Sequence, residues 1–145
     1  MSAPAPADLV VGQQVAARAV RLTRADLVHY AGASGDRNPI HWSEPAASDA
    51  GLPGVVAHGM LTMAAAVSLV VEWVGDPGAV VEYGVRFTGL VPVPATGAAV
   101  LEVTATIGAV DAAAGTARVD LAVRCDGVAV LGRARAVVRL GGAAG

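Results

Sequence analysis

A short segment, Ser34–His41, carries a carboxylate (Asp36), an amide (Asn38) and an imidazole (His41) within six residues. A glycine bends the backbone of this segment and a proline stiffens it. An acidic side chain and an imidazole that converge on one point can hold a hydroxyl group or a water while a proton is transferred. Judged by residue types alone, Asp36 and Asn38 would more commonly serve to form turns. Acid-base catalysis and turn formation are therefore both open at this point.

A second candidate is the run Ala57-His58-Gly59-Met60, at the start of a long apolar segment. The first N–H groups of a helix have no partners within the helix, and that end carries a partial positive charge. Because Gly59 has no side chain, a carbonyl oxygen can approach its N–H closely, which predicts an oxyanion hole with one donor. An ordinary helix start is the alternative, and we favour a structural role for His58.

Several helices are expected to position these residues. Thr-x-x-Asp at Thr23 predicts a capped short helix over 23–30, and the turn formers of 32–39 predict a loop. Ser43 before Glu-Pro predicts the start of another short helix. Residues 58–73 are apolar on all sides, so they predict a buried helix of roughly 24 Å.

Period-two alternation of apolar side chains predicts the strands. Together with a weaker strand over 13–21, they indicate an α+β fold with an antiparallel sheet of about five strands. Such a sheet can curl around one helix but cannot enclose it, so we predict that a partner subunit covers the rest. The expected inward residues are Val81, Tyr83, Val85 and Phe87; Leu101, Val103, Ala105 and Ile107; Val119, Leu121, Val123 and Cys125; and Val128, Val130, Gly132, Ala134, Ala136 and Val138.

Asp126-Gly127 predicts a two-residue hairpin turn between two of these strands. With that turn, Asp120 would face Arg133, and Arg118 would face Arg135 on the outer surface. Two adjacent guanidinium groups favour an external phosphate or carboxylate group. The alternative is that the two arginines point apart into water.

Composition excludes several classes of protein. All 10 basic residues are arginines, which rules out lysine chemistry, and a formal net charge of -2 gives no general reason to bind nucleic acid. No apolar run is long enough to span a membrane, and residues 1–8 do not resemble a signal peptide. With a single cysteine besides, we expect a cytoplasmic protein. We expect one domain over 9–140, a disordered leader over 1–8 and a disordered tail over 141–145.

Two motifs, Tyr30–His41 and Ala57–Leu61, resemble the hydratase motif of the MaoC-like, (R)-specific enoyl-thioester hydratases and dehydratases. Within that family the likeness is strongest to the catalytic subunits of actinobacterial (3R)-hydroxyacyl-ACP dehydratases, and it extends from about Gly12 to Leu140. Asp-x-Asn-Pro-x-His is its most specific part. The resemblance implies a hotdog fold, in which an antiparallel sheet wraps around a long central helix.

The resemblance also implies roles for individual residues. Asp36 and His41 would flank the C3 hydroxyl or the attacking water, Asn38 would orient the loop or the water, and the Gly59 N–H would bind the thioester carbonyl. The implied reaction is the reversible dehydration of (3R)-hydroxyacyl thioesters to trans-2-enoyl thioesters, without a cofactor. We predict that His41 removes the C2 proton and Asp36 protonates the departing hydroxyl, although one residue acting in both roles stays open.

Partners and alternatives stay open as well. The acyl group is expected on an acyl carrier protein or on coenzyme A. The pantetheine phosphate or an acidic carrier protein would then be the anion that Arg118 and Arg135 contact. The second subunit is expected to be either a copy of this chain or a different hotdog chain. A hotdog subunit that binds acyl chains without catalysis is the alternative function. A weaker alternative is a metal site formed by Asp36, His41 and His58. A serine hydrolase is weaker still, because Asp36 stands where a nucleophile elbow needs glycine.

Overall fold

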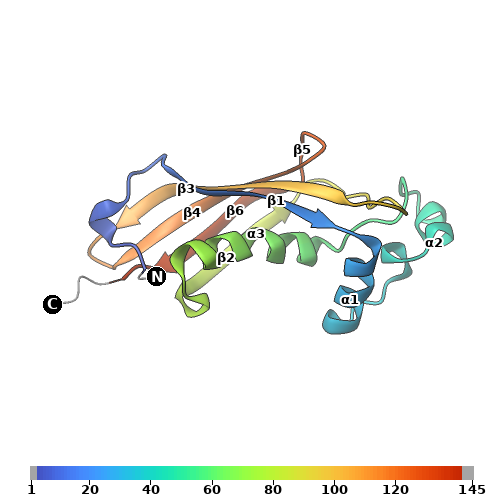
Figure 1. Ribbon diagram of the computed structural model, residues 1–145, viewed down its shortest axis with the longest axis horizontal. Helices are drawn as coiled ribbons and strands as arrows, with labels where there is room; N and C mark the ends of the chain where they lie inside the picture. The colour runs from blue at the N-terminus through green and yellow to red at the C-terminus, as the bar shows by residue number, and fades with distance from the viewer. Residues whose placement is uncertain (1–2, 142–145) are drawn as a thin grey trace.

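The computed structural model describes residues 3–141 and contains one antiparallel sheet with a helix lying along one face (Figure 1). Two shorter helices lie beyond one end of that helix. This arrangement confirms the expected α+β class. In chain order the elements are η1 (Pro6–Asp8), β1 (Gln14–Leu22), α1 (Arg24–Ser34), η2 (Pro39–His41), α2 (Glu44–Asp49), α3 (Gly59–Val74), η3 (Pro77–Ala79), β2 (Val80–Phe87), β3 (Ala99–Asp111), β4 (Thr116–Cys125), β5 (Val128–Ala129) and β6 (Leu131–Arg139).

The sheet has the strand order β1-β3-β4-β6-β2, and the two-residue strand β5 pairs with β4. Five long strands therefore match the predicted number, with β5 in addition. The central strands β3 and β4 bury alternate side chains, as expected from their period-two pattern. These side chains form a large part of the core between the sheet and α3, and they include Leu101, Val103, Ala105, Ile107, Val119, Leu121 and Val123.

Three residues that we predicted to face the core lie largely exposed. In β2, Val81 and Phe87 are 45% and 54% exposed, and Val128 in β5 is 62% exposed. The reason for β2 is its place at the edge of the sheet, where it pairs with β6 alone. Alternation in the sequence identifies a strand but does not tell whether that strand is central or at an edge.

The Asp126-Gly127 turn forms as predicted, with φ of 50° and 76°, and it pairs Cys125 with Val128. The register predicted beyond the turn is wrong. Asp120 lies opposite Arg135 instead of Arg133, and Arg118 opposite Val137 instead of Arg135.

A bulge causes this displacement. The chain between Val130 and Ala134 holds three residues, whereas the opposite stretch of β4, from Val123 to Leu121, holds one. Within the bulge, Arg133 has a φ of 46°. Because two extra residues are inserted, the alternation is preserved: Ala134, Ala136 and Val138 are still buried.

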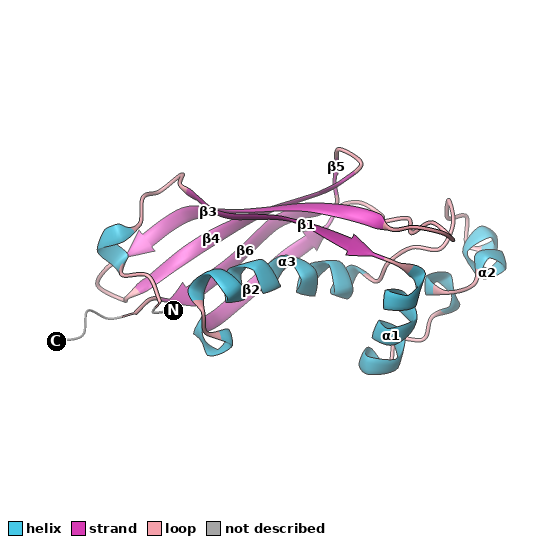
Figure 2. Cartoon of the chain, viewed as in Figure 1, coloured by secondary structure: helices cyan, strands magenta, loops and turns pink. Residues whose placement is uncertain are grey.

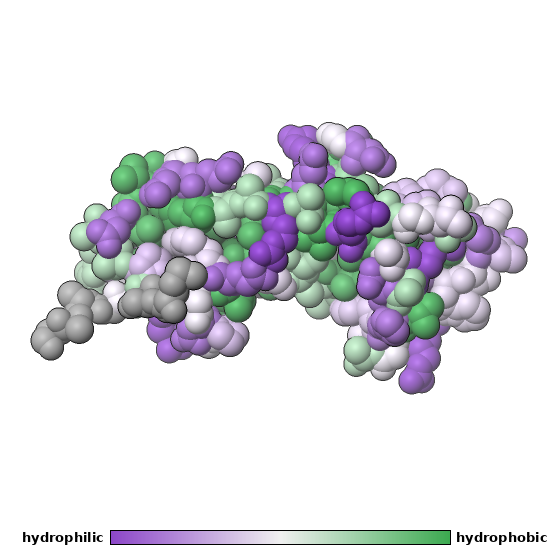
Figure 3. Space-filling model, in the orientation of Figure 1, coloured by the Kyte–Doolittle hydropathy of each residue, from purple (hydrophilic) through white to green (hydrophobic). Residues whose placement is uncertain are grey.

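Helix α3 lies along one face of the sheet (Figure 2). It begins after His58, close to the predicted start, and ends at Gly75, whose φ of 76° suits a glycine. The side facing the sheet is buried, but Met60 on the opposite side is 57% exposed. In Figure 3, apolar and polar side chains are interspersed on the molecular face that carries α3. One sheet thus covers one side of this apolar helix.

Helix α1 confirms the predicted cap. The Thr23 side chain accepts a hydrogen bond from the Asp26 N–H, and the Asp26 carboxylate accepts one from the Thr23 N–H. The helix continues to Ser34, so the loop is shorter than the predicted 32–39. Residues 6–8 of the expected leader form the turn η1, and residues 142–145 of the expected tail lie outside the described part of the chain. Between residues 3 and 141, no helix is long and apolar enough to cross a membrane.

Candidate active site

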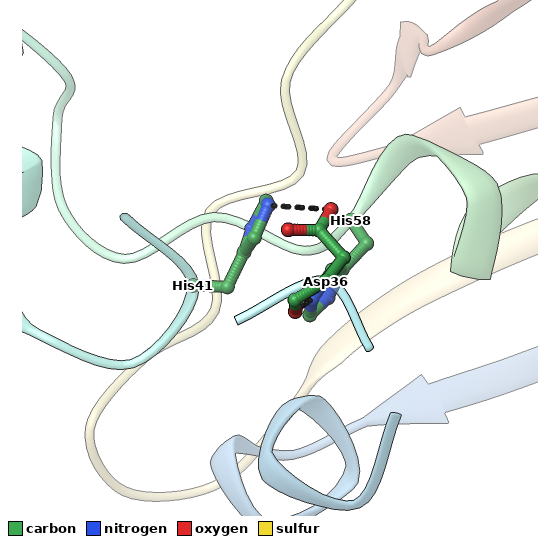
Figure 4. Close-up of side chains that lie close together, drawn as sticks. All are labelled: Asp36, His41 and His58. Atoms are coloured by element: carbon green, nitrogen blue, oxygen red, sulfur yellow. Dashed lines mark hydrogen bonds and ion pairs between the residues drawn. The ribbon is translucent and has the colours of Figure 1, made fainter. Parts of the chain in front are cut away.

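Asp36 is positioned by the C-terminus of α1. The helix ends at Gly35, which has a φ of 77° and donates its N–H to the Ala31 carbonyl. The chain then turns, and Asp36 Oδ1 accepts a hydrogen bond from the Asn38 N–H at 3.1 Å. One carboxylate oxygen is thereby tied into the loop, whereas Oδ2 points toward His41 (Figure 4).

Asn38 holds the next turn of the loop. Its Oδ1 accepts a hydrogen bond from the Ile40 N–H at 3.2 Å and caps the short helix η2. Proline at the first position of η2 fits a site where no N–H partner is needed. The side-chain oxygen of Asn38 therefore orients the segment that carries both Asp36 and His41.

His41 is buried, and its position defines its tautomer. Its Nδ1 lies 2.7 Å from the carbonyl oxygen of Val56. Because a carbonyl can only accept, Nδ1 carries the hydrogen, and Nε2 of the neutral ring keeps its lone pair. That Nε2 lies 3.8 Å from Asp36 Oδ2 (Figure 4). The separation is too long for a direct hydrogen bond, but a hydroxyl or water oxygen beside the two groups can contact both.

His58 connects the pieces of the site. Its side chain is 1% exposed, and its Nε2 donates to the Asp36 carbonyl oxygen at 3.0 Å. Its ring stacks on that of His41, with centroids 3.7 Å apart and an interplanar angle of 21°. Burial lowers the pKa of His58, and the hydrogen bond to Asp36 opposes this only in part. The sequence placed His58 at the helix start but did not reveal its contacts with the catalytic candidates.

Gly59 is the first residue of α3, so its N–H lies at the helix N-terminus. A Cβ at this position would lie 2.9 Å from Phe87 Cε1, which is closer than van der Waals contact allows. The absence of a side chain at Gly59 therefore lets the Phe87 ring pack over the start of the helix. Gly59, Asp36, His41 and His58 all line one cavity of about 350 Å³.

The remainder of this cavity is mainly apolar. Three residues at its rim, Met60, Phe87 and Leu90, are 57%, 54% and 52% exposed. The cavity thus has a polar part formed by the two histidines and Asp36, beside a wall suited to a hydrocarbon chain. The apolar lining consists of Ile40, Val56, Ala57, Met60, Phe87, Leu90, Val91, Val130 and Leu131.

A metal site was one alternative for the same residues. One ligand atom from each of Asp36, His41 and His58 lies within 4.8 Å of the others. However, a histidine lone pair lies in the plane of its ring, and the two rings here are stacked. Lone pairs in nearly parallel planes do not converge on one ion as tetrahedral or octahedral coordination requires. The arrangement fits proton transfer better than metal binding.

Arg118 and Arg135 do not form the facing pair that we predicted. Both approach the carboxylate of Asp120: Arg118 Nε lies 2.8 Å and Arg135 Nε 3.9 Å from its Oδ1. The carboxylate of Asp120 thus offsets the positive charge of the two arginines, which an external anion would need for binding. The proposed phosphate or carrier contact at these arginines loses its geometric basis, since it depended on the wrong register.

Comparison with known proteins identifies the family. The profile of the MaoC like domain matches residues 7–124, so the chain belongs to this family, as the motifs indicated. A 3-hydroxyacyl-thioester dehydratase X of Mycobacterium tuberculosis is 42% identical over 80 residues, which are 55% of this chain and 28% of that protein. The fatty acid synthase subunit beta of Saccharomyces cerevisiae is 49% identical over 47 residues, 32% of this chain and 2% of that one. The chain spans less than a third of either relative.

Solved structures agree with the hotdog fold. A protein described as a MaoC-like dehydratase superposes with a TM-score of 0.93 and 41% identity, over 97% of this chain and 43% of that chain. An (R)-hydratase from A. caviae, described as involved in PHA biosynthesis, superposes with a TM-score of 0.81 and 22% identity over 92% of this chain and 98% of its own. At that identity the second similarity concerns the fold alone.

Proposed function

We propose that this chain is a hydro-lyase that interconverts (3R)-hydroxyacyl thioesters and trans-2-enoyl thioesters. The observation that carries the proposal is the 3.8 Å gap between His41 Nε2 and Asp36 Oδ2, in the cavity that Gly59 also lines. Family membership and the dehydratase relative agree with this reaction.

In the dehydration direction, His41 Nε2 takes the C2 proton, since that nitrogen holds the lone pair while Nδ1–H is bound to the Val56 carbonyl. The electrons of the C2–H bond form the C2=C3 double bond as the C3–O bond breaks. Protonated Asp36 gives its proton to the departing hydroxyl, which leaves as water. Hydration is the same path reversed, with Asp36 taking a proton from the attacking water.

Negative charge develops on the thioester oxygen when C2 loses its proton. The N–H of Gly59, at the N-terminus of α3, is the donor that we assign to this oxygen. Such a donor contributes about 3 to 4 kcal/mol, and a general acid or base roughly 10²- to 10⁴-fold in rate. These contributions belong to this chain's own groups, and no cofactor takes part in the proposed step.

The substrate is an acyl thioester on coenzyme A or on an acyl carrier protein, with its acyl chain along the apolar wall of the cavity. The exposed rim at Met60, Phe87 and Leu90 is the part that a second hotdog chain would cover. We infer that this partner, either a second copy or a different chain, completes the wall.

The test is the addition of water to a trans-2-enoyl thioester by the purified chain, followed as loss of the absorbance of the conjugated thioester. The proposal expects activity that falls roughly 10²- to 10⁴-fold in both Asp36→Asn and His41→Ala. Full activity in either variant would contradict the assigned roles. Activity that appears only after a second hotdog chain is added, and that is lost with Asp36→Asn, would identify a heterodimer with this chain as its catalytic subunit. Activity that then survives both substitutions would instead indicate the non-catalytic acyl-binding alternative.

A further inference from the structure

His58 has a property that packing alone does not explain. Its ring is nearly completely buried, yet Nδ1 has no hydrogen-bond partner among the described residues. A buried polar atom without a partner destabilises the folded state. A phenylalanine ring would fill a similar volume without this cost. The imidazole therefore needs a reason beyond filling the core.

The contacts of the imidazole suggest that reason. Its Nε2–H donates to the backbone carbonyl of Asp36, whereas its backbone precedes Gly59 at the start of α3. Its ring face supports the ring of His41. A single residue thus joins the acid, the base and the proposed oxyanion donor, which lie on three different segments of the chain.

The tether to Asp36 acts where the loop is otherwise held by local contacts. Asp36 accepts hydrogen bonds from the Asn38 N–H and donates its own N–H to Ser34, and both partners are within two residues. The bond from His58 spans 22 residues and ties the loop to α3. Since the Asp36 side chain is 53% exposed, burial does little to fix its position.

We propose that His58 is a positioning residue, a proposal that rests on the function proposed above. Its neutral imidazole ties the backbone of Asp36 to the first turn of α3 and so sets the distance between the Asp36 carboxyl group and His41. His58 must be neutral for two reasons. Its Nε2 has to carry the hydrogen that it donates to Asp36, and a second proton, on Nδ1, would find no acceptor. The ionisable groups that face this ring are Asp36, His41 from η2 and Tyr30 from α1, whose ring lies edge-on at 4.8 Å.

Two substitutions separate the tether from packing. His58→Phe keeps a stacking ring but removes the donor, and His58→Gln keeps an N–H donor but removes the ring. We expect kcat of His58→Phe to fall about 10²-fold with KM changed less than about threefold, because a displaced catalytic group impairs the chemical step more than binding. His58→Gln should recover most of that loss. Tyr30→Phe, which keeps the edge-on ring, is the matched control and should behave as wild type.

Thermal unfolding gives the contrast with a merely structural role. His58→Phe removes the unpartnered Nδ1 together with the hydrogen bond from Nε2, and these two changes have opposite effects on stability. Its Tm should therefore change little while its kcat falls. Wild-type kcat in a well-folded His58→Phe would overturn the tether, and so would equal losses in the Phe and Gln variants. If wild type itself adds no water to the enoyl thioester, the proposed function fails, and amide hydrogen exchange then decides the tether. Faster exchange over residues 35–41 in His58→Phe, but not in His58→Gln, supports it, and unchanged exchange contradicts it.

Discussion

Asp36 and His41 differ in how the fold holds them. His41 is 7% exposed and fixed by a backbone carbonyl, whereas the Asp36 side chain is 53% exposed. In the proposed reaction, His41 is the rigid base that removes a proton from carbon, and Asp36 is the more accessible acid that exchanges with water. The difference comes from the positions of the two residues, at η2 and at the end of α1.

The pair could be proposed from the sequence because Asp-x-Asn-Pro-x-His matches the hydratase motif of the family, whereas the residue types alone favour a turn. The geometry of the pair could not. The Nδ1 contact of His41 is with Val56, which lies 15 residues further along the chain. The stack on His58 likewise depends on how the loop folds back over α3. Long-range contacts of this kind leave no local pattern in the sequence.

Substitution of Gly59 tests the helix N-terminus at the residue scale. Gly59→Ala places a Cβ within 2.9 Å of the Phe87 ring, which must move into the cavity or away from it. We expect kcat/KM for enoyl hydration to fall at least about tenfold. This loss should be smaller than the roughly 10²- to 10³-fold loss that follows removal of an oxyanion donor. The double variant with Phe87→Ala should regain activity if crowding is the cause. If the double variant regains no activity, the loss comes from displacement of the Gly59 N–H itself.

The pH dependence of stability tests the buried state of His58. Burial lowers the pKa of His58 below its usual 6.5. The unfolded chain therefore binds more protons than the folded one between that lowered pKa and 6.5, so the free energy of unfolding decreases as the pH falls through this window. In urea titrations at about pH 7.5 and pH 5.5, wild type should lose more stability than His58→Phe. Equal losses of stability in the two proteins would mean that protonation of His58 does not destabilise the folded state.

At the scale of elements, capping residues determine where the site lies. The capped start of α1, the Ser43 cap of α2 and the Asp126-Gly127 turn could all be predicted because each depends on neighbouring residues. The register of β6 could not, because at the bulge Gly132 approaches Thr88, the residue after β2, which is distant in the sequence. A Cβ at Gly132 would lie 2.9 Å from Thr88 Cγ2. Because of that single bulge, Arg118 and Arg135 do not lie opposite each other as predicted.

Two glycines of α1 provide a matched test of this capping. Gly35 has a φ of 77° at the C-cap, whereas Gly32 lies within the helix, and neither would bring a new Cβ within 4 Å of another group. Gly35→Ala should destabilise the protein by about 1 kcal/mol and reduce kcat by displacing Asp36. Gly32→Ala should stabilise it by about 0.5 to 1 kcal/mol. Thermal denaturation and the hydration assay measure both effects, and similar results for the two variants would refute the role of the left-handed cap.

At the scale of the whole molecule, the described chain leaves its central helix half covered. The sheet buries one side of α3, and the other side includes the exposed residues Met60 and Ala64. The sequence predicted this incompleteness, because a helix without a polar side needs cover all round. It could not indicate that β2, the strand beside the cavity, is an edge strand with exposed apolar side chains.

A charge on the outer side of α3 tests whether a partner covers it. Ala64→Glu should weaken self-association, or binding of a second hotdog chain, at least about tenfold, because a carboxylate would be buried without a partner. Ala25→Glu, in the first turn of α1, is the control and should leave association unchanged. Analytical ultracentrifugation measures both. Unaltered association of Ala64→Glu would show that the interface lies elsewhere.

The central claim is that Asp36 and His41 act together on one substrate across their 3.8 Å gap. The most direct measurement is kcat for enoyl-thioester hydration in Asp36→Asn, in His41→Ala and in the double variant. Groups that act as a unit give non-additive losses, so the double variant should be no more than a few-fold slower than the slower single variant. A double variant whose loss equals the product of the two single losses would mean that the residues act independently, and it would contradict the account.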